Sequence, residues 1–395
     1  MTATSTAARS PFDTLEELAP LIRQHAAESE AQATLARPVA DALIEGGLFR
    51  QLTPASLGGG ECDPVTWFEV VEAGARIDGS VGWCLLVNGS TGLGGRTMPE
   101  ADAEALYGDP RTVVAGAAFP FAKAVAVNDG YQVTGRWPFA SGCKHATHVF
   151  GFSVVHDGDT PRPGPMGLPD IRVMLAPASN VRIIDTWDVV GLSGTGSHDI
   201  AFEDVFVPEA CAISLAPMPP NRHYQGALYR LPFLTMFAWP TAAVALGIAQ
   251  HSIDIVTELA QNKVPVGTVS TSLNARPLFQ LQLADAVASV RSARAWLHQS
   301  IAELRTIAEA GGVADLQARI NGQLAASNAT RSARAAVELM FLAGGSTAVY
   351  RKNDLQRCMR DIHALSQHTV TGPASWEQAG VVLAGLPPQN PLILL

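Results

Sequence analysis

The sequence predicts an α+β protein built from an N-terminal helical domain, a middle antiparallel β-barrel or sandwich, and a C-terminal four-helix bundle. Apolar residues recur at helical spacing before residue 110, β-branched residues alternate from there to about 210, and long alanine-rich helical segments fill the rest. No amphipathic helical segment separates the β-runs, so a parallel βαβ sheet is not expected. We place the domains at 11–109, 110–212 and 225–395.

The composition predicts a well-buried globular protein that binds neither nucleic acid nor membranes. Hydrophobic residues make up 47% and charged residues 16% of the 395 positions, and the net charge of −9 opposes polyanionic partners. The N-terminal segment lacks the apolar core of a signal peptide, and scattered cysteines fit free thiols in a reducing compartment, so we expect a cytoplasmic protein. These cysteines, none in a C-x-x-C pair, are Cys62, Cys84, Cys143, Cys211 and Cys358.

The N-terminal domain is predicted from an apolar stripe and from helix punctuation. Leu15, Leu18 and Ile22 share one helical face, and Pro38 suits the first turn of a second helix that ends at Gly46. Further helices are expected at Pro64–Ala75, Gly82–Val87 and Pro99–Tyr107.

The β-domain is predicted from a hairpin and from four later runs. Two alternating runs flank the turn residues 128–130 (Asn-Asp-Gly), which form a strong hairpin signal. The later strands are expected at His148–Val155, Ile171–Leu175, Val181–Trp187 and Asp199–Val207.

The bundle is predicted from long helical segments at 240–260, 277–310 and 314–343, with breaks at 265–267 and 311–312. The stretch 231–248 is almost entirely apolar. It contains two prolines and continues into polar residues, so we expect a buried core helix rather than a membrane span.

A candidate proton-transfer residue lies near the C-terminus. Asn353 or Asp354 is a suitable N-cap, apolar residues follow at helical spacing, and Gly372-Pro373 signals a turn, so His368 is expected near a helix end. A helix C-terminus stabilises a protonated imidazole, and histidine titrates near neutral pH, which suits proton transfer. The segment is equally compatible with a helix-capping histidine.

The segment GRWPFASGCKHATHVF (135–150) can form a platform for a planar ligand. Trp137, Phe139 and Ser141 alternate, which predicts that they share one face of a strand. An aromatic floor with a hydroxyl at its end can hold a heterocycle by stacking and by a bond to a ring nitrogen. An ordinary sheet core is the alternative. Cys143 and His145 would face away from a third ligand in the segment, His148, so we predict no metal site. 

Two glycine-rich stretches are open to a structural or a binding role. Residues 191–199 join two strands and could present N–H groups to a ligand, but they lack a dinucleotide fingerprint, and their Ser, His and Asp are sequence neighbours that cannot form a triad. Gly344 and Gly345 end a helix and would allow close approach of a ligand or a second subunit. In the next helix, an i,i+4 ion pair between Arg357 and Asp361 is expected.

Together, these features resemble the acyl-CoA dehydrogenase superfamily over nearly the whole chain. The domain order matches, and WDVVGLSGTGSHDIAFEDVFVPE is similar to the hallmark stretch of the family's middle domain. GRWPFASGCKHATHVF and LQRCMRDIHALSQH resemble the flavin-dependent monooxygenase branch, the oxygenase components of two-component hydroxylases such as the steroid-ring-A phenol hydroxylases. The match is specific to the branch rather than to a substrate.

The resemblance implies a reduced flavin, FMN or FAD, held between the β-domain and the bundle, with a neighbouring subunit of a homotetramer completing the site. His368 matches the histidine that this branch places beside flavin C4a and the substrate. Trp137 of the aromatic platform is a further cofactor-binding candidate. The positions that match the family's flavin-contacting stretches are Phe119, Phe121, Ala122, Phe139, Ser141, Gly142, Ser193, Thr195, Gly344 and Gly345.

Two departures from the family pattern narrow the chemistry. The dehydrogenases carry a glutamate base where this chain has Thr369, and Glu377 lies beyond a turn and is a poor substitute. Several phenol hydroxylases carry a second histidine after a GSxGW pattern, where this chain offers Asn88, Ser90 and Thr91.

The expected activity is therefore oxygenation of a small, aromatic or polycyclic organic substrate. A separate reductase would supply the reduced flavin, because the sequence shows no nicotinamide-binding βαβ unit, and a C4a-hydroperoxyflavin formed with O2 would transfer one oxygen atom. His368 would act as a base on the substrate or as a partner of the peroxide. The alternatives are an acyl-CoA dehydrogenase-like flavin dehydrogenase or oxidase, and a catalytically silent flavin-binding member of the fold.

Overall fold

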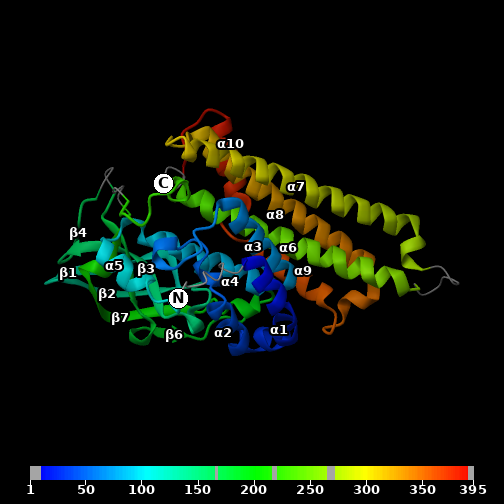
Figure 1. Cartoon of the computed structure of the whole chain (residues 1–395), viewed down its shortest axis with the longest axis horizontal. Coiled ribbons are helices and arrows are strands. Elements are labelled where there is room, and N and C mark those ends of the chain that lie inside the picture. Colours follow the sequence, from blue (N-terminus) through cyan, green and yellow to red (C-terminus); the bar gives the residue numbers. More distant parts are fainter. Residues whose placement is uncertain (1–9, 165–167, 216–219, 265–271, 390–395) are drawn as a thin grey trace, which may run out of the picture.

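A computed structural model describes residues 10–164, 168–215, 220–264 and 272–389. The helical and β-rich segments follow one another in the predicted order. The sheet lies at one side of the molecule, the long helices extend away from it, and the N-terminal helices lie against both (Figure 1).

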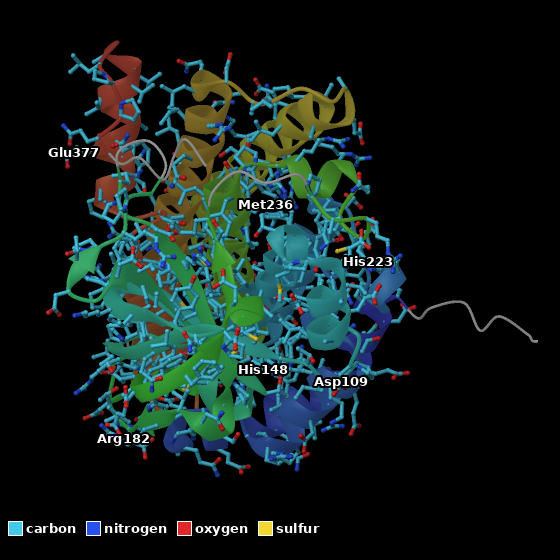
Figure 2. The ribbon with its side chains drawn as sticks, turned by 90° about the vertical axis from the view of Figure 1, so that its left-hand side faces the viewer. Asp109, His148, Arg182, His223, Met236 and Glu377 are labelled. Carbon is cyan, nitrogen blue, oxygen red and sulfur yellow. The ribbon has the colours of Figure 1, made fainter. Side chains whose placement is uncertain are left out.

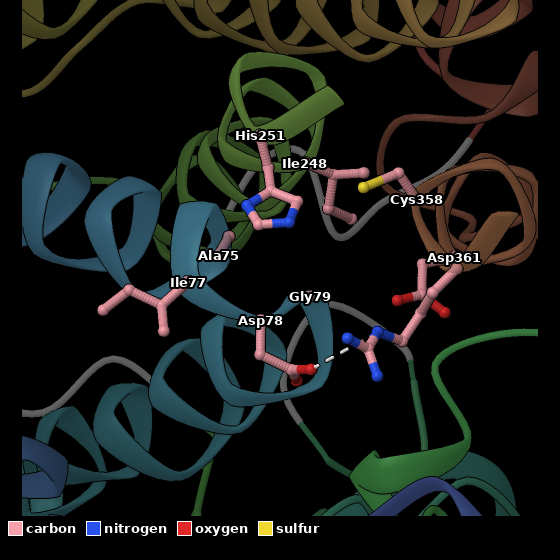
Figure 3. Close-up of a pocket in the computed structure, with 9 residues that line it drawn as sticks. Ala75, Ile77, Asp78, Gly79, Ile248, His251, Cys358 and Asp361 are labelled. Carbon is pink, nitrogen blue, oxygen red and sulfur yellow. Dashed lines mark ion pairs between the residues drawn. The ribbon is translucent and has the colours of Figure 1, made fainter. Parts of the chain in front are cut away.

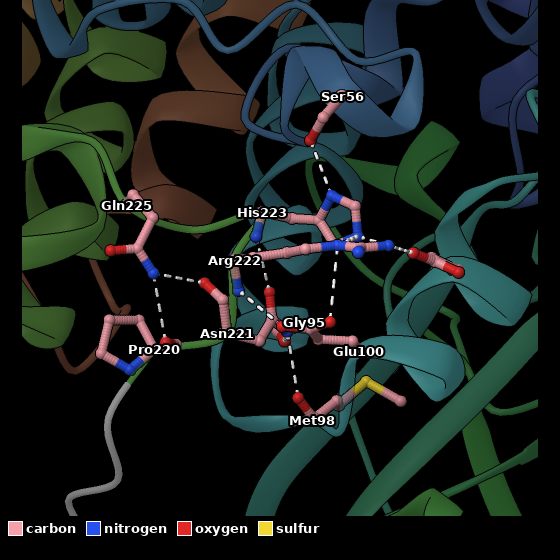
Figure 4. A network of polar contacts seen from close by, with 10 residues as sticks. Ser56, Gly95, Met98, Glu100, Pro220, Asn221, Arg222, His223 and Gln225 are labelled. Carbon is pink, nitrogen blue, oxygen red and sulfur yellow. Dashed lines mark hydrogen bonds and ion pairs between the residues drawn. The ribbon is translucent and has the colours of Figure 1, made fainter.

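The N-terminal domain is helical and its helices begin at capping residues. Ser10, Asp63 and Asp78 accept backbone N–H bonds at the starts of α1, α3 and α4. The connection between residues 220 and 225 is tied to this domain: Asn221 Nδ2 donates to the carbonyls of Gly95 (2.9 Å) and Met98 (3.0 Å) (Figure 4). The helices are α1 (Pro11–Gln32), α2 (Arg37–Glu45), α3 (Pro64–Ile77), α4 (Gly79–Ser90) and α5 (Glu100–Tyr107).

The middle domain contains one sheet with the strand order β6-β7-β2-β1-β3-β5-β8, and β4 pairs with β3. The predicted hairpin is confirmed, because Val127 pairs with Gly130 across a two-residue turn. Of the strand predicted at 181–187, only 182–184 pairs. The strands are β1 (Val114–Val127), β2 (Gly130–Trp137), β3 (His148–Asp157), β4 (Thr160–Pro161), β5 (Ile171–Pro177), β6 (Arg182–Ile184), β7 (Asp199–Pro208) and β8 (Ala212–Ser214).

The prediction of a purely antiparallel sheet is wrong for β1 and β3, which run parallel. β2 ends at the same end of the sheet where β1 begins. Residues 138–147 then cross over to the other side of β1 at this end, so that His148 pairs with Val114. A strand that starts at the same end as β1 must run in the same direction. This crossover carries the predicted aromatic and hydroxyl residues.

The C-terminal part packs long helices side by side. Gly311 has φ +75°, which confirms the predicted break between α7 and α8, whereas the break predicted at 265–267 lies outside the described residues. α6 is long and apolar enough to cross a membrane, but 78% of its most apolar stretch is buried inside the protein. The helices are α6 (Phe233–Asn262), α7 (Pro277–Glu309), α8 (Leu316–Gly344), α9 (Asp354–Leu365) and α10 (Pro373–Leu383).

Two large hydrophobic cores and a small cluster between α8 and α10 around Ile320 and Ala379 hold the described chain together. The N-terminal helices and the bundle share one core, and the β-domain has its own. α6 connects the N-terminal helices to the bundle: a Cβ on Gly247 would overlap the backbone of Glu72 in α3, so only glycine allows the two helices to come this close. The β-domain therefore meets a continuous helical body, and the candidate site lies where they join.

Candidate active site

The crossover after β2 exposes an aromatic ring on a strained backbone. Phe139 has φ +65°, which is uncommon for a bulky residue and persists only where the surrounding structure imposes it. Its side chain is 65% exposed and meets the ring of Trp187 edge-on, with 5.8 Å between the centroids. Residues held in this way cluster at binding sites.

The prediction that Trp137 shares a face with Phe139 and Ser141 is wrong. Trp137 is 0% exposed in the core of the β-domain, and its Nε1 donates to the Phe152 carbonyl at 3.1 Å. The left-handed backbone at Phe139 breaks the alternation of the strand, so one ring points inward and the other outward. Trp137 is therefore part of the core of the sheet, and its side chain is not on the face that exposes Phe139.

Phe119, Phe121 and Ala122 lie on β1 beside the end of β2. The rings of Phe119 and Phe121 are both exposed, with centroids 4.9 Å apart. A Cβ on Gly135 of β2 would overlap Ala122, which places this stretch next to the segment that leads to Phe139. Exposed aromatic faces at this position fit a planar ring system.

A chain of hydrogen-bonded hydroxyl groups lies behind Ser141. Trp83 Nε1 donates to Ser141 Oγ at 2.9 Å, and Ser141 Oγ lies 2.7 Å from Ser197 Oγ. Ser197 Oγ lies 2.7 Å from Thr195 Oγ1, which donates to the Leu192 carbonyl at 2.7 Å. Thr195 is 1% exposed and its hydroxyl bonds within the protein, so its side chain is turned away from the surface; the cofactor-binding role expected for Thr195 stays a prediction.

Backbone bonds join the crossover to the loop of residues 191–198. The Gly142 N–H donates to the Thr195 carbonyl at 2.8 Å. Gly142 has φ +76°, and a Cβ there would meet the side chains of Asn88 and His145. The side of Gly142 where a Cβ would lie is therefore occupied by protein side chains, and the flavin contact expected at Gly142 stays a prediction. Ser193 is half-buried, and its Oγ donates to the Val189 carbonyl at 3.3 Å.

His368 lies three residues beyond the end of α9 and packs against Trp83. The two rings meet edge to face, with centroids 5.1 Å apart. Burial lowers the pKa of His368 to about 4, so the expected stabilisation of a protonated imidazole by the helix end is wrong. Within the described chain, Nε2 has no hydrogen-bond partner, and Nδ1 has only a long contact from the Val370 N–H, at 3.5 Å.

The loop that carries His368 is held from α8. The buried amide of Gln323 donates to the Val370 carbonyl and, at 3.2 Å, to Ser375 Oγ. Ser375 Oγ in turn donates to the Thr369 carbonyl at 2.7 Å. The two residues that follow His368 are therefore held by α8 and α10, while Trp83 packs against its imidazole ring.

Gly344 and Gly345 lie at the other end of α9 from His368. Lys263 Nζ donates to the Gly344 carbonyl at 2.5 Å, and Gly345 has φ +54°, which confirms the predicted helix end. The 12 residues of α9 span about 18 Å at 1.5 Å per residue. Within one chain, these glycines are not brought to Ser141 and His368.

A buried ionic cluster of Asp78, Arg357 and Asp361 joins the elements of the site, and Figure 3 shows Asp78 and Asp361 on the elements that meet there. The expected i,i+4 ion pair between Arg357 and Asp361 is wrong. Arg357 instead pairs with Asp354 (2.6 Å) and Asp78 (3.9 Å). Asp361 accepts the Leu192 N–H at 2.6 Å. Burial and the nearby Asp78 carboxylate raise the pKa of Asp361 to about 7.

The three possible metal ligands of the crossover face different partners. Cys143 Sγ donates to the Gly196 carbonyl at 3.6 Å, and His145 Nε2 lies 3.2 Å from Asn88 Oδ1. His148 lies near Asp109, at the start of β3 (Figure 2). Among the described residues, no group of three or more His, Cys, Asp or Glu could hold a metal ion.

Comparisons with known proteins assign this chain to a protein family. Residues 240–373 match the model of the acyl-CoA dehydrogenase C-terminal domain. The chain is 33% identical over 367 residues to the indole-3-acetate monooxygenase of Pseudomonas putida, covering 93% of this chain and 91% of that protein. The chain belongs to the flavin-dependent monooxygenases of the acyl-CoA dehydrogenase fold.

Two further relatives cover almost the whole monooxygenase chain. The oxygenase subunit HsaA of a flavin-dependent monooxygenase from Mycobacterium tuberculosis is 30% identical over 399 residues, covering 98% of each chain. The crystal structure of 3-HSA hydroxylase from Rhodococcus sp. RHA1 superposes with a TM-score of 0.87 at 27% identity, covering 97% of this chain and 99% of that one. The predicted family, fold and flavin cofactor are confirmed.

Sequence reasoning missed two residues of the monooxygenase site. Trp83 links Ser141 to His368, and Ser197 links Ser141 to Thr195. The only available signal was their position in two motifs, because Trp83 belongs to the GSVGW pattern and Ser197 to the GLSGTGS loop. Nothing local in either motif showed which side chain would point toward Ser141.

Proposed function

We propose that this chain is the oxygenase component of a two-component system that hydroxylates a small aromatic molecule. The contacts of Trp83 with both the Ser141 hydroxyl and neutral His368, next to the exposed ring of Phe139 two residues before Ser141, carry the proposal. The bound flavin, FMN or FAD, would supply two electrons, so that one atom of O2 enters the substrate and the other leaves as water. A separate reductase would deliver the reduced flavin.

The exposed aromatic residues and Ser141 would bind the flavin ring. Phe139 and Phe121 offer stacking faces, and Ser141 Oγ offers a bond to a ring nitrogen. An imidazole with a pKa near 4 is neutral at pH 7 but is a weak base, since a general base works best with a pKa near the working pH. We therefore assign His368 a hydrogen bond to the reacting oxygen rather than strong proton abstraction.

The relatives and the sequence support the substrate class and the reaction class. One relative is named for indole-3-acetate, an aromatic acid, which favours an aromatic substrate here. The His368 loop (residues 366–372) contains no carboxylate, which disfavours the α-proton abstraction of an acyl-CoA dehydrogenase.

The proposed assembly is a cytoplasmic homotetramer. Gly344 and Gly345 lie one helix length away from His368 within one chain, so their proposed flavin contact would be made to a neighbouring subunit. Exposed Leu342, Val349 and Tyr350 beside these glycines support a subunit contact there. Sedimentation of the purified protein tests the tetramer.

The first experiment mixes the protein with anaerobically reduced FMN or FAD and then with oxygenated buffer. We expect a transient flavin absorbance that outlives the reaction of free flavin with oxygen. Unprotected reoxidation would contradict the proposal, and bleaching of oxidised flavin by an acyl-CoA would support the dehydrogenase instead.

His368→Ala tests the role of the imidazole. We expect the rate of product formation to fall by about 10²–10³-fold, the scale for losing one hydrogen bond to the reacting oxygen, with little change in flavin affinity. His368→Asn should retain part of the activity because it keeps an N–H donor. His363→Ala is the matched control, because His363 lies on α9 and pairs with Glu338, away from Trp83. Equal product yields in the alanine variants of both histidines would remove His368 from the mechanism.

A further inference from the structure

The hydroxyl chain behind Ser141 has only one arrangement of hydrogens that satisfies every contact. Trp83, Ser141, Ser197 and Thr195 each contribute one hydrogen, and they are joined to one another and to the Leu192 carbonyl by four short contacts. The carbonyl can only accept, so Thr195 must donate to it. Ser197 must then donate to Thr195, and Ser141 must donate to Ser197.

This arrangement leaves Ser141 with no hydrogen to offer a ligand. Its single hydrogen points to Ser197, and one lone pair accepts the Trp83 N–H. The second lone pair is the only bonding position left on the oxygen. Reversing the chain would leave Thr195 Oγ1 and the Leu192 carbonyl oxygen 2.7 Å apart with no hydrogen between them. Two facing oxygen lone pairs at this distance repel, and the repulsion is strong in a buried site.

Trp83 connects Ser141 to His368, which the family resemblance places beside flavin C4a, so the ring nitrogen that Ser141 would meet is N5, the neighbour of C4a. The two redox forms of a flavin differ at this atom. The central ring nitrogen N5 carries a hydrogen in the reduced flavin and only a lone pair in the oxidised flavin. An oxygen that can only accept therefore bonds the reduced form and faces the oxidised form lone pair to lone pair. This reasoning rests on the proposed flavin contact of Ser141.

We propose that Thr195 and Ser197, which do not face the ligand, fix Ser141 as a hydrogen-bond acceptor and thereby make the site select reduced over oxidised flavin. The device would suit an oxygenase component that takes reduced flavin from another protein and must release the oxidised product. Thr195 and Ser197 act through Ser141, so they are positioning residues.

The test measures anaerobic dissociation constants of full-length protein for dithionite-reduced and oxidised FMN and FAD. We expect the wild type to bind the reduced form more tightly. Thr195→Val keeps the shape of the side chain but frees Ser197 to donate back to Ser141, so the preference should fall by roughly tenfold, mainly through tighter binding of oxidised flavin. That change corresponds to a drop of about 30 mV in the midpoint potential of the bound two-electron couple.

Two further variants separate this effect from general damage. Thr195→Ser keeps the hydroxyl and should restore the wild-type preference. Ser197→Ala removes the acceptor of the Ser141 hydrogen and should reduce the preference at least as much as Thr195→Val. Circular dichroism and thermal midpoints show whether each variant is folded.

The outcomes distinguish this inference from the proposed function. Protein that binds flavin with the same ratio in wild type, Thr195→Val and Ser197→Ala overturns the inference alone, as does a wild type that prefers oxidised flavin. Wild-type protein that binds neither form overturns the proposed function and the inference with it.

Discussion

At Phe139 a single residue combines backbone strain with an exposed apolar ring. Its left-handed conformation costs on the order of 1–3 kcal/mol for a side chain of this kind, and the exposed ring gains little from packing in the protein alone. Both features are unfavourable in an isolated chain and useful for stacking on a flavin. The residue is therefore better explained by binding than by stability.

Phe139→Asn tests this explanation. Asparagine tolerates a positive φ, so we expect the free energy of unfolding without flavin to change by less than about 1 kcal/mol, while the dissociation constant for flavin rises roughly tenfold through loss of the stacked ring. Urea unfolding and flavin titration measure the two quantities. Phe139→Tyr keeps the ring and is the control; an asparagine variant that binds flavin as well as the tyrosine variant would contradict the assignment.

Three elements of the site converge on the Asp78–Arg357–Asp361 cluster. Asp78 caps α4, which carries Trp83, and Asp361 lies on α9, which leads to His368. Through the Leu192 N–H, Asp361 also holds the loop that begins the hydroxyl chain. The distance between α4 and α9 at this cluster therefore determines the positions of Trp83, of His368 and of the loop at Leu192 relative to one another.

Gly79→Ala tests that distance. A Cβ on Gly79 would lie 2.9 Å from Asp361 Oδ2 and 3.1 Å from Ile248, so one element must shift. We expect the free energy of unfolding to fall by about 1–3 kcal/mol through overpacking, and flavin affinity to fall with it. Gly380→Ala in α10 is the control, because its Cβ would meet nothing within 4 Å and alanine should stabilise the helix by up to about 1 kcal/mol. Similar thermal shifts for both variants would show that α4 and α9 tolerate separation.

Across the whole molecule, buried titratable groups give stability opposite dependences on pH. The pKa of His368 and of His145 falls from 6.5 to about 4, so their contribution is present above pH 6.5 and is lost as pH falls through 4. The pKa of Asp361 rises from 3.8 to about 7, so its contribution is present below pH 3.8 and is lost as pH rises through 7. Between pH 4 and 6.5 these effects oppose each other.

Asp361→Asn should expose the histidine effect. The asparagine Oδ1 can still accept the Leu192 N–H, but the side chain cannot ionise. We expect stability to rise more steeply between pH 4.5 and 6.5 in the variant than in the wild type, as measured by urea unfolding at fixed protein concentration without flavin. Parallel curves for the two proteins would rule out a buried, titrating Asp361.

Turns, helix starts and helix breaks, which depend on a few neighbouring residues, could be predicted from the sequence alone. Asn128 to Gly130 specified the hairpin, Asn353 specified a helix start, and Gly311 specified a helix break. These signals are legible because turn chemistry, capping and periodicity act over a few residues. The family resemblance added the flavin, and it marked His368 and Ser141.

The contacts between distant side chains and their pKa values could not be predicted from the sequence and are visible only in the folded structure. The positive φ at Phe139 reversed the expected orientation of Trp137, and the Trp83–Ser141 bond joins residues 58 positions apart. Asp361 meets Leu192 across 169 positions instead of pairing with Arg357 one turn away. Burial, rather than the helix end, set the pKa of His368. Long-range packing and the local dielectric are properties of the assembled fold, so local patterns in the sequence do not carry them.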